Sequence, residues 1–236
     1  MTLVLATRNG HKLRELHRLL DGIDVQPLPE HAATTEETGS TFAENALIKA
    51  RAAVAATGRD AIADDSGIGA EALDWRPGVR SARYAGGAAT DATNLDKLIA
   101  EVPPGSRLRY TCVIAHVAAD GTESLFEGIC EGTMAPAAAG AGGFGYDPVF
   151  ALPDGRTMAQ LADTDKDAVS HRGVAARALR AWLSSAEVDR RAEPDGREHA
   201  RVAEVLLDQQ DRGGDQADAD GDQPRDAGEV HGRIVP

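Results

Sequence analysis

The apolar residues near the start of the chain form a continuous run and then recur at helical spacing. Leu3 to Ala6 has the pattern of a strand buried on both faces. A polar loop containing Gly10 follows, and a helix is predicted from the apolar residues after it, Leu13, Leu16, Leu19 and Leu20. A strand, a glycine-containing loop and a helix form a layout in which backbone N–H groups bind phosphate, although many such loops bind nothing.

The next segments alternate in the same way. Residues 23–28 can form a second strand, and Thr41 with Glu44 fits a capping box that opens an alanine-rich helix. This helix is predicted to end at Gly58. On spacing alone, Lys49 in its middle is an ordinary solvated lysine.

The second half begins with a helix predicted for residues 91–102, which Pro103 and Pro104 stop. Two β-rich runs, 108–118 and 123–131, flank Asp120-Gly121, a pair typical of a β-hairpin. We therefore expect two antiparallel strands here.

The most informative stretch is Ala61 to Ile68, an apolar run that leads into Asp64, Asp65, Ser66 and Gly67. Neighbouring side chains on a strand point to opposite faces, so only one aspartate can face a given cleft. A strand is predicted to end at this pair, with Gly67 allowing a sharp turn. A carboxylate there suits a metal ion or an activated water; the alternative is a surface turn, because Asp, Ser and Gly are common turn residues.

Two later segments also carry candidate chemistry. Phe144 and Tyr146 stand among glycines, which indicates either a loop that stacks on a ring or a hydrophobic anchor for that loop. His171 and Arg172 stand at the entrance to a helix and face whatever its N-terminus faces, unless they form a solvated cap.

Composition narrows the class of protein. The formal net charge is −13, and about half of it falls in the acidic segment after residue 186. The body is also acidic, which argues against non-specific nucleic-acid binding. No apolar run is long enough for a membrane span, and two cysteines suggest free thiols, so we expect a cytoplasmic protein. The polar composition from residue 185 onward predicts a disordered extension after a domain of residues 1–184.

Taken together, six blocks of the chain resemble the inosine triphosphate pyrophosphatase family, the bacterial XTP/dITP diphosphatases. These blocks are Ala6-Thr7-Arg8-Asn9 with Lys12 and Glu15; Glu37-Thr38-Gly39 with Phe42, Glu44-Asn45-Ala46 and Lys49; Ala63-Asp64-Asp65-Ser66-Gly67; Ser81-Ala82-Arg83-Tyr84; Gly142 to Pro148; and Ser170-His171-Arg172-Gly173. The resemblance implies an elongated α/β fold, with a mixed central sheet and two lobes flanking a nucleotide cleft. It also implies a homodimer and Mg²⁺-dependent hydrolysis of non-canonical purine triphosphates (dITP/ITP and XTP) to the monophosphate and pyrophosphate.

The resemblance also implies roles for individual residues. Asp65 would be the catalytic base and a Mg²⁺ ligand, Glu37 a second Mg²⁺ ligand, and Ser66 a substrate contact. The triphosphate would be held by Thr7, Arg8, Asn9, Gly10, His11, Lys12 and Lys49. The nucleoside would be surrounded by Phe144, Gly145, Tyr146, Asp147, Lys166, His171 and Arg172.

Two departures from the family pattern stand out. The stretch before Gly142 is alanine-rich where the family often has a basic residue, and the segment after residue 185 has no counterpart.

The chemistry agrees with the resemblance, since attack of water on the α-phosphorus needs a base, a metal and cations near the leaving group. The alternatives are a pyrophosphatase for other modified nucleotides and a non-catalytic purine-nucleotide-binding protein.

Overall fold

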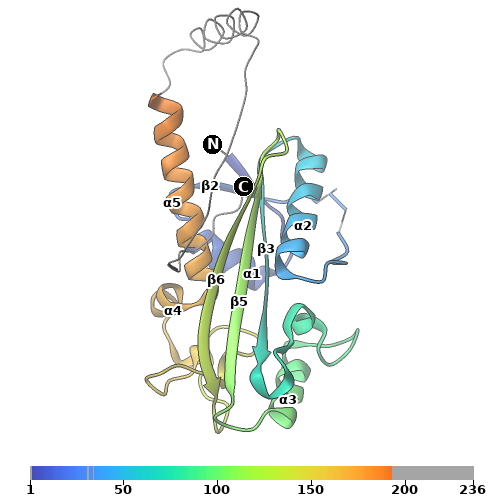
Figure 1. Cartoon of the computed structure of the whole chain (residues 1–236), viewed down its shortest axis with the longest axis vertical. Coiled ribbons are helices and arrows are strands. Elements are labelled where there is room, and N and C mark those ends of the chain that lie inside the picture. Colours follow the sequence, from blue (N-terminus) through green and yellow to red (C-terminus); the bar gives the residue numbers. More distant parts are fainter. Residues whose placement is uncertain (1, 31, 34, 193–236) are drawn as a thin grey trace, which may run out of the picture. The chain divides into compact units, whose positions relative to one another are not determined.

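The computed structural model describes residues 2–30, 32–33 and 35–192. Within these residues, a mixed sheet of seven strands has the order β2-β1-β3-β5-β6-β7, and β4 pairs with β3 (Figure 1). The strands are β1 (Thr2–Leu5), β2 (Asp24–Pro27), β3 (Ala61–Ala70), β4 (Arg76–Pro77), β5 (Arg107–Val117), β6 (Glu123–Met134) and β7 (Phe150–Ala151). β1 runs parallel to β2 and β3, and the other pairs are antiparallel. The predicted α/β class with a mixed central sheet is confirmed.

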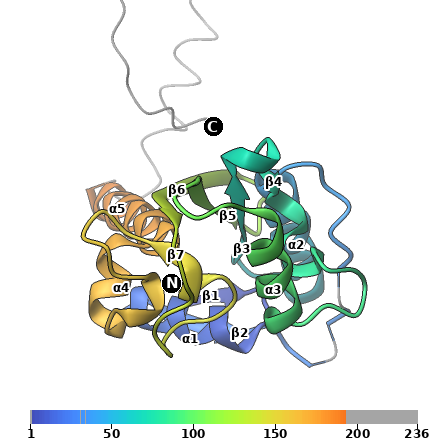
Figure 2. The ribbon, with the colours of Figure 1, turned by 90° about the horizontal axis from the view of Figure 1, so that it is seen from below.

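The helices connect and cover these strands. They are α1 (Gly10–Leu19), α2 (Phe42–Thr57), α3 (Asp91–Glu101), α4 (Asp163–Val169) and α5 (His171–Ala192), with the shorter 3₁₀ turns η1 (Glu71–Leu73), η2 (Gly78–Arg83), η3 (Asp147–Val149) and η4 (Met158–Gln160). Figure 2 shows α2 on the opposite side of β3 and β5 from α4 and the start of α5. No helix in the described part of the chain is both long and apolar enough to cross a bilayer.

The predicted domain boundary after residue 184 falls inside α5 and stays a prediction. Residues up to Ala181 form one compact unit, and a second begins at Trp182, inside α5. α5 continues to Ala192, past the predicted domain end at residue 184. The rest of the predicted disordered extension, residues 193–236, lies outside the described residues.

The alanines of α2 bring this helix close to the sheet. Ala46, Ala50 and Ala53 are buried against β1, β3 and β5. Small side chains at a packing surface allow short distances between elements. The predicted capping box of Thr41 and Glu44 is present and begins the helix. The polar residues of α2 therefore lie within reach of β3.

The strand prediction at the aspartate pair is wrong. β3 does not end there but continues through Gly67 to Ala70, paired with β5 along its full length. Gly67 makes no turn; a Cβ atom there would overlap the Ser81 hydroxyl and the Gly78 carbonyl oxygen, so glycine is needed for close packing of η2. The surface-turn alternative is wrong as well, because Asp64 and Asp65 are both buried.

Candidate active site

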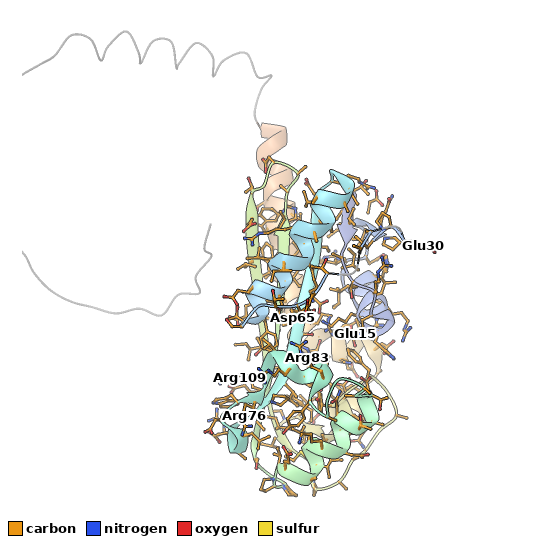
Figure 3. All side chains as sticks on the ribbon, turned by 90° about the vertical axis from the view of Figure 1, so that its right-hand side faces the viewer. Glu15, Glu30, Asp65, Arg76, Arg83 and Arg109 are labelled. Carbon is orange, nitrogen blue, oxygen red and sulfur yellow. The ribbon has the colours of Figure 1, made fainter. Side chains whose placement is uncertain are left out.

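A cavity of about 640 Å³ lies beside β3. Its walls come from the β1–α1 loop, α2, β3, η2, the loop before η3, and the start of α5. Figure 3 shows Asp65 between α2 and the segment that carries Arg83. The predicted site residues that line the cavity are Thr7, Arg8, Asn9, Lys12, Glu37, Lys49, Asp65, Ser66, Phe144, Gly145, Tyr146, Asp147, Lys166, His171 and Arg172. The volume lies in the range of small-molecule sites.

Asp65 presents its carboxylate to the cavity on the α2 side of β3. Its Oδ2 accepts a hydrogen bond of 3.1 Å from Asn45 Nδ2, and its Oδ1 lies 3.5 Å from Lys49 Nζ. Burial raises the pKa of Asp65; Lys49 and Lys12 oppose this rise, and the nearby Glu37 adds to it. A buried carboxylate with a raised pKa that opens onto a cavity has the properties of a general base.

Lys49 links Asp65 to the loop that precedes α2. Its ammonium donates to Glu37 Oε1 at 2.5 Å and to the Asp64 carbonyl oxygen at 2.7 Å. Burial alone would lower the pKa of Lys49, but Asp64, Asp65 and Glu37 outweigh burial and raise it. The prediction of an ordinary solvated lysine is therefore wrong.

Asp64 points to the opposite face of β3, as the alternation of side chains requires. Its Oδ2 lies 3.0 Å from Lys12 Nζ and 3.1 Å from Arg172 Nη2. Burial would raise the pKa of Asp64, but Lys12, Arg172 and Lys49 outweigh it and lower the pKa. Asp64 is thus the buried counter-ion of two cations that line the cavity.

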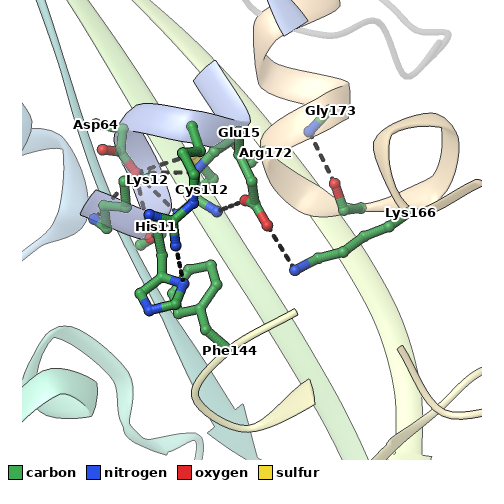
Figure 4. Close-up of polar contacts among 12 residues, drawn as sticks. His11, Lys12, Glu15, Asp64, Cys112, Phe144, Lys166, Arg172 and Gly173 are labelled. Atoms are coloured by element: carbon green, nitrogen blue, oxygen red, sulfur yellow. Dashed lines mark hydrogen bonds and ion pairs between the residues drawn. The ribbon is translucent and has the colours of Figure 1, made fainter. Parts of the chain in front are cut away.

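The ion pairs continue from Arg172 to Glu15, Lys166 and Asp147. Figure 4 shows the part from Asp64 to Lys166. Arg172 Nη1 pairs with Glu15 Oε2, and Lys166 Nζ lies 2.6 Å from both Glu15 Oε1 and Asp147 Oδ2. Burial would raise the pKa of Glu15, but Arg172 and Lys166 lower it, so the acid stays ionised. These ion pairs hold Lys166 and Arg172 in charged form in the cavity wall.

An aromatic ring lies beside these cations. Lys166 Nζ is 5.0 Å from the centroid of the Phe144 ring, and Arg172 Cζ is 5.7 Å from it. Asp147 accepts a hydrogen bond from the Phe144 backbone N–H at 2.9 Å, which fixes the loop. The ring-stacking interpretation fits Phe144, which is half-buried and lines the cavity, whereas Tyr146 is buried and donates to the Ser81 carbonyl oxygen at 2.7 Å.

His171 and Arg172 do not form a solvated cap, because both are buried. The His171 ring stacks on Tyr110, with a centroid distance of 4.5 Å. Burial, together with Arg172 and Lys166, holds the pKa of His171 well below its usual range. Its Nδ1 is buried without a hydrogen-bond partner among the described residues, so a ligand in the cavity can supply one.

The residues of the predicted phosphate loop make different kinds of contact. Asn9 caps α1 by accepting from the N–H groups of His11 and Lys12, so these donors are already used. Arg8 Nη2 donates to the backbone carbonyls of residues 29, 30 and 32. Gly10 and His11 are not among the cavity-lining residues, and the His11 ring instead stacks on Phe144 at 5.1 Å.

The donor set around Glu37 and Asp65 fits a hard divalent cation. Both carboxylates contact the same ammonium group, that of Lys49. In the described part of the chain, no group of three or more His, Cys, Asp or Glu residues could hold a metal alone. Mg²⁺ commonly binds one or two carboxylates and takes its remaining ligands from water and substrate phosphates. The residues therefore fit Mg²⁺ bound together with a phosphate ligand.

A comparison with protein families gives this geometry a context. The family described as "Ham1 family" matches residues 3–182. This chain belongs to the Ham1 family. The family predicted from the sequence blocks is thereby confirmed, and every residue that lines the cavity falls inside the matched range.

Relatives of this Ham1 chain support the assignment. The dITP/XTP pyrophosphatase of Erwinia tasmaniensis is 50% identical over 182 residues, which cover 73% of this chain and 89% of that protein. A solved HAM1 protein from Coxiella burnetii is 41% identical, with a TM-score of 0.71 over 78% of this chain and 99% of the other. A solved dITP/XTP pyrophosphatase from Mycobacterium abscessus is 43% identical, with a TM-score of 0.61 over the same shares.

Sequence reasoning missed several residues of the Ham1 site. Asp64 and Glu15 were not assigned roles, although they pair with Lys12, Arg172 and Lys166. Asn45 was also missed; it precedes Lys49 by one helical turn, a spacing that places both on one face of α2. The cavity walls also include residues to which the sequence analysis assigned no role: Val79, Ser81, Ala82, Arg83, Asp91 and Asn94.

Proposed function

We propose that this Ham1-family chain hydrolyses non-canonical purine nucleoside triphosphates, dITP/ITP and XTP, to the monophosphate and pyrophosphate. The observation that carries the proposal is the combination of two groups of side chains in one cavity. A buried carboxylate lies beside Lys49, and an aromatic ring lies beside two fixed cations. The printed name of the relatives, dITP/XTP pyrophosphatase, describes a substrate that such a cavity suits.

Asp65 would act on the water that attacks the α-phosphorus. The carboxylate takes a proton from this water as the new P–O bond forms, and the bond to pyrophosphate breaks. Lys49 lies beside Asp65, Lys12 also lines the cavity, and both would supply positive charge for the leaving pyrophosphate. Asp65 and Glu37 would hold Mg²⁺, which when bound neutralises charge on the phosphate oxygens.

The Phe144 ring and the cations beside it would read the base. Phe144 offers a ring for stacking, and two of the three N–H groups of Lys166 are used by Glu15 and Asp147. The third can donate to a 6-keto oxygen. Adenine presents an amino group at this position, and two facing donors cost ~1–3 kcal/mol, or tenfold to a few hundredfold in rate. The keto bases are therefore favoured over adenine.

The bond that is cleaved can be tested by isotope labelling. Hydrolysis of dITP in H₂¹⁸O with Mg²⁺ should give pyrophosphate and dIMP, with the label in dIMP, because water attacks the α-phosphorus. Release of dIDP and inorganic phosphate would contradict the proposal. Binding of dITP without any turnover would favour the non-catalytic alternative.

A homodimer, which the family resemblance implies, and a cytoplasmic location, which is expected from the composition, complete the proposal. We expect light scattering of the purified chain to give twice the mass of 24.7 kDa. A monomer at assay concentrations that retains full activity would contradict a functional role for the dimer.

A further inference from the structure

The ammonium of Lys49 already has protein partners inside the cavity. Its ammonium has three N–H donors. Three acceptors surround it: Glu37 Oε1 at 2.5 Å, the Asp64 carbonyl oxygen at 2.7 Å, and Asp65 Oδ1 at 3.5 Å. In this arrangement every donor faces the protein, so Lys49 cannot also bind a phosphate until it releases at least one partner.

The two side-chain partners of Lys49 are the carboxylates assigned to Mg²⁺. Mg²⁺ binds oxygen at about 2.0–2.1 Å. An ion at that distance from both Glu37 and Asp65 would occupy the space of the ammonium, and the two positive charges would repel each other strongly at such a separation. Lys49 and a divalent cation therefore exclude each other between these carboxylates.

We propose that Lys49 is an exchangeable counter-ion, which holds Glu37 and Asp65 until a divalent cation replaces it and the substrate triphosphate takes up its ammonium. This inference rests on the proposed function, because it needs a metal ion and a triphosphate in the same cavity. Its mechanistic consequence is ordered use of the site. A metal ion alone must displace an ammonium that has no new partner, whereas a metal with a triphosphate supplies that partner.

One hydrogen bond of Lys49, to the backbone of β3, can persist during the exchange. The Asp64 carbonyl oxygen belongs to β3 and carries no net charge, so this hydrogen bond does not compete with metal binding at the carboxylates. Lys49 can leave Glu37 and Asp65 while its side chain stays over β3. The Lys49 side chain is 15% exposed, and its ammonium then lies at the cavity wall where phosphates would bind.

This exchange can be tested without turnover by the binding of Mn²⁺ to the nucleotide-free protein. Electron paramagnetic resonance measures the free ion and so gives the bound fraction. The wild type should bind Mn²⁺ weakly, in roughly the millimolar range of low-affinity sites. Lys49→Met removes the competing charge and should tighten binding about tenfold or more, the effect typical of one neighbouring charge. Lys49→Arg keeps the charge, and binding should stay weak.

Matched variants show whether the effect is local. Lys12→Met removes one positive charge from the same cavity, but Lys12 contacts Asp64 rather than Glu37 or Asp65, so its effect should be much smaller. Adding Glu37→Gln to Lys49→Met should abolish the gain. Lys49→Gln is a second neutral variant, and circular dichroism shows which variants are folded.

The inference is overturned if the wild type already binds Mn²⁺ at micromolar concentrations, if folded Lys49→Met or Lys49→Gln gains nothing, or if Lys12→Met gains as much. Pyrophosphate release from dITP by the same wild-type preparation separates this failure from failure of the proposed function. Turnover without a gain in the variants contradicts the exchange alone. Absence of turnover contradicts the function, whatever the variants bind.

Discussion

At the scale of single residues, the two adjacent aspartates of β3 have separate environments. Asp65 faces Asn45 and Lys49, and Asp64 faces Lys12 and Arg172 on the other side of the strand. The pKa of Asp65 is raised and that of Asp64 is lowered. Two carboxylates with shifts in opposite directions suit a base and a structural counter-ion.

Asp65→Asn keeps the volume of the side chain but removes the base and one metal ligand. We expect turnover of dITP to fall by at least ~10²–10⁴-fold, the usual contribution of a general base, with the fold retained. Glu36→Gln is the control, because Glu36 is an exposed carboxylate at the same cavity and its loss should have a far smaller effect. Pyrophosphate release measures both. Retention of a tenth of the activity by Asp65→Asn would contradict the assigned role.

His171 gives a prediction for stability against pH. Its pKa in the folded protein is well below 6.5, so below pH ~6.5 the unfolded chain binds a proton that the folded chain does not. Stability should therefore fall as the pH drops, by ~1 kcal/mol from pH 6.5 to 5.5 for this residue. His171→Gln should reduce the difference between urea unfolding at pH 7.5 and pH 5.5. An equal pH dependence in His171→Gln and in the wild type would contradict the lowered pKa of His171.

The residue roles could be predicted only in part from the sequence. Asp65, Lys49 and Lys166 do line one cavity, as expected from the blocks that carry them. The pairs that hold them could not be read from local sequence: Glu15 is 151 positions from Lys166, and Arg172 is 108 positions from Asp64. Periodicity reports local conformation, whereas these pairs depend on how α1, β3 and α5 pack.

At the scale of elements, most helices and strands were predictable, and the errors have a clear cause. The capping box of α2 and the hairpin of β5 and β6 were found because the signals, Thr41 with Glu44 and Asp120-Gly121, are local. β3 was predicted to end early because charged residues rarely lie inside a buried strand. Cations from α1, α2 and α5 compensate Asp64 and Asp65, and this compensation allows the strand to continue.

The contact between α5 and β6 gives a prediction at this scale. A Cβ atom at Gly128 would overlap the His171 carbonyl oxygen and the Ala175 backbone nitrogen, so the start of α5 must move to accept a side chain. Gly128→Ala should destabilise the protein by ~1–3 kcal/mol and lower kcat/KM by displacing His171 and Arg172. Gly87→Ala is the control, because its Cβ would meet no atom within 4 Å. Thermal unfolding and turnover of dITP measure both; a Gly128→Ala variant as stable and active as wild type would contradict this packing.

At the scale of the whole molecule, the cavity is contained in the family-matched part of the chain. Its lining residues run from Ala6 to Arg172, and the family match ends at residue 182. A chain that stops after Ala192 should therefore keep kcat/KM for dITP within about twofold of the full chain. A chain that stops after Ser170 lacks His171 and Arg172 and should be inactive. Loss of activity in the 1–192 chain would show that the rest of the sequence contributes to catalysis.

The resemblance of six short blocks predicted the family and the α/β class for this whole region, which the family match and the sheet topology confirm. The role of the acidic segment after residue 192 could not be predicted, since it has no block of the family and its only short apolar cluster is Val202 to Leu207.

The central claim is that the cavity selects keto purines and cleaves their triphosphates with Asp65 and a divalent cation. The most direct measurement is kcat/KM for pyrophosphate release from dITP, XTP, dATP and dTTP, with Mg²⁺ and with the metal removed by EDTA. We predict that dITP and XTP exceed dATP by tenfold or more, that EDTA abolishes turnover, and that Asp65→Asn is inactive on every substrate. Equal rates on dITP and dATP, or turnover that persists in EDTA, would contradict the account.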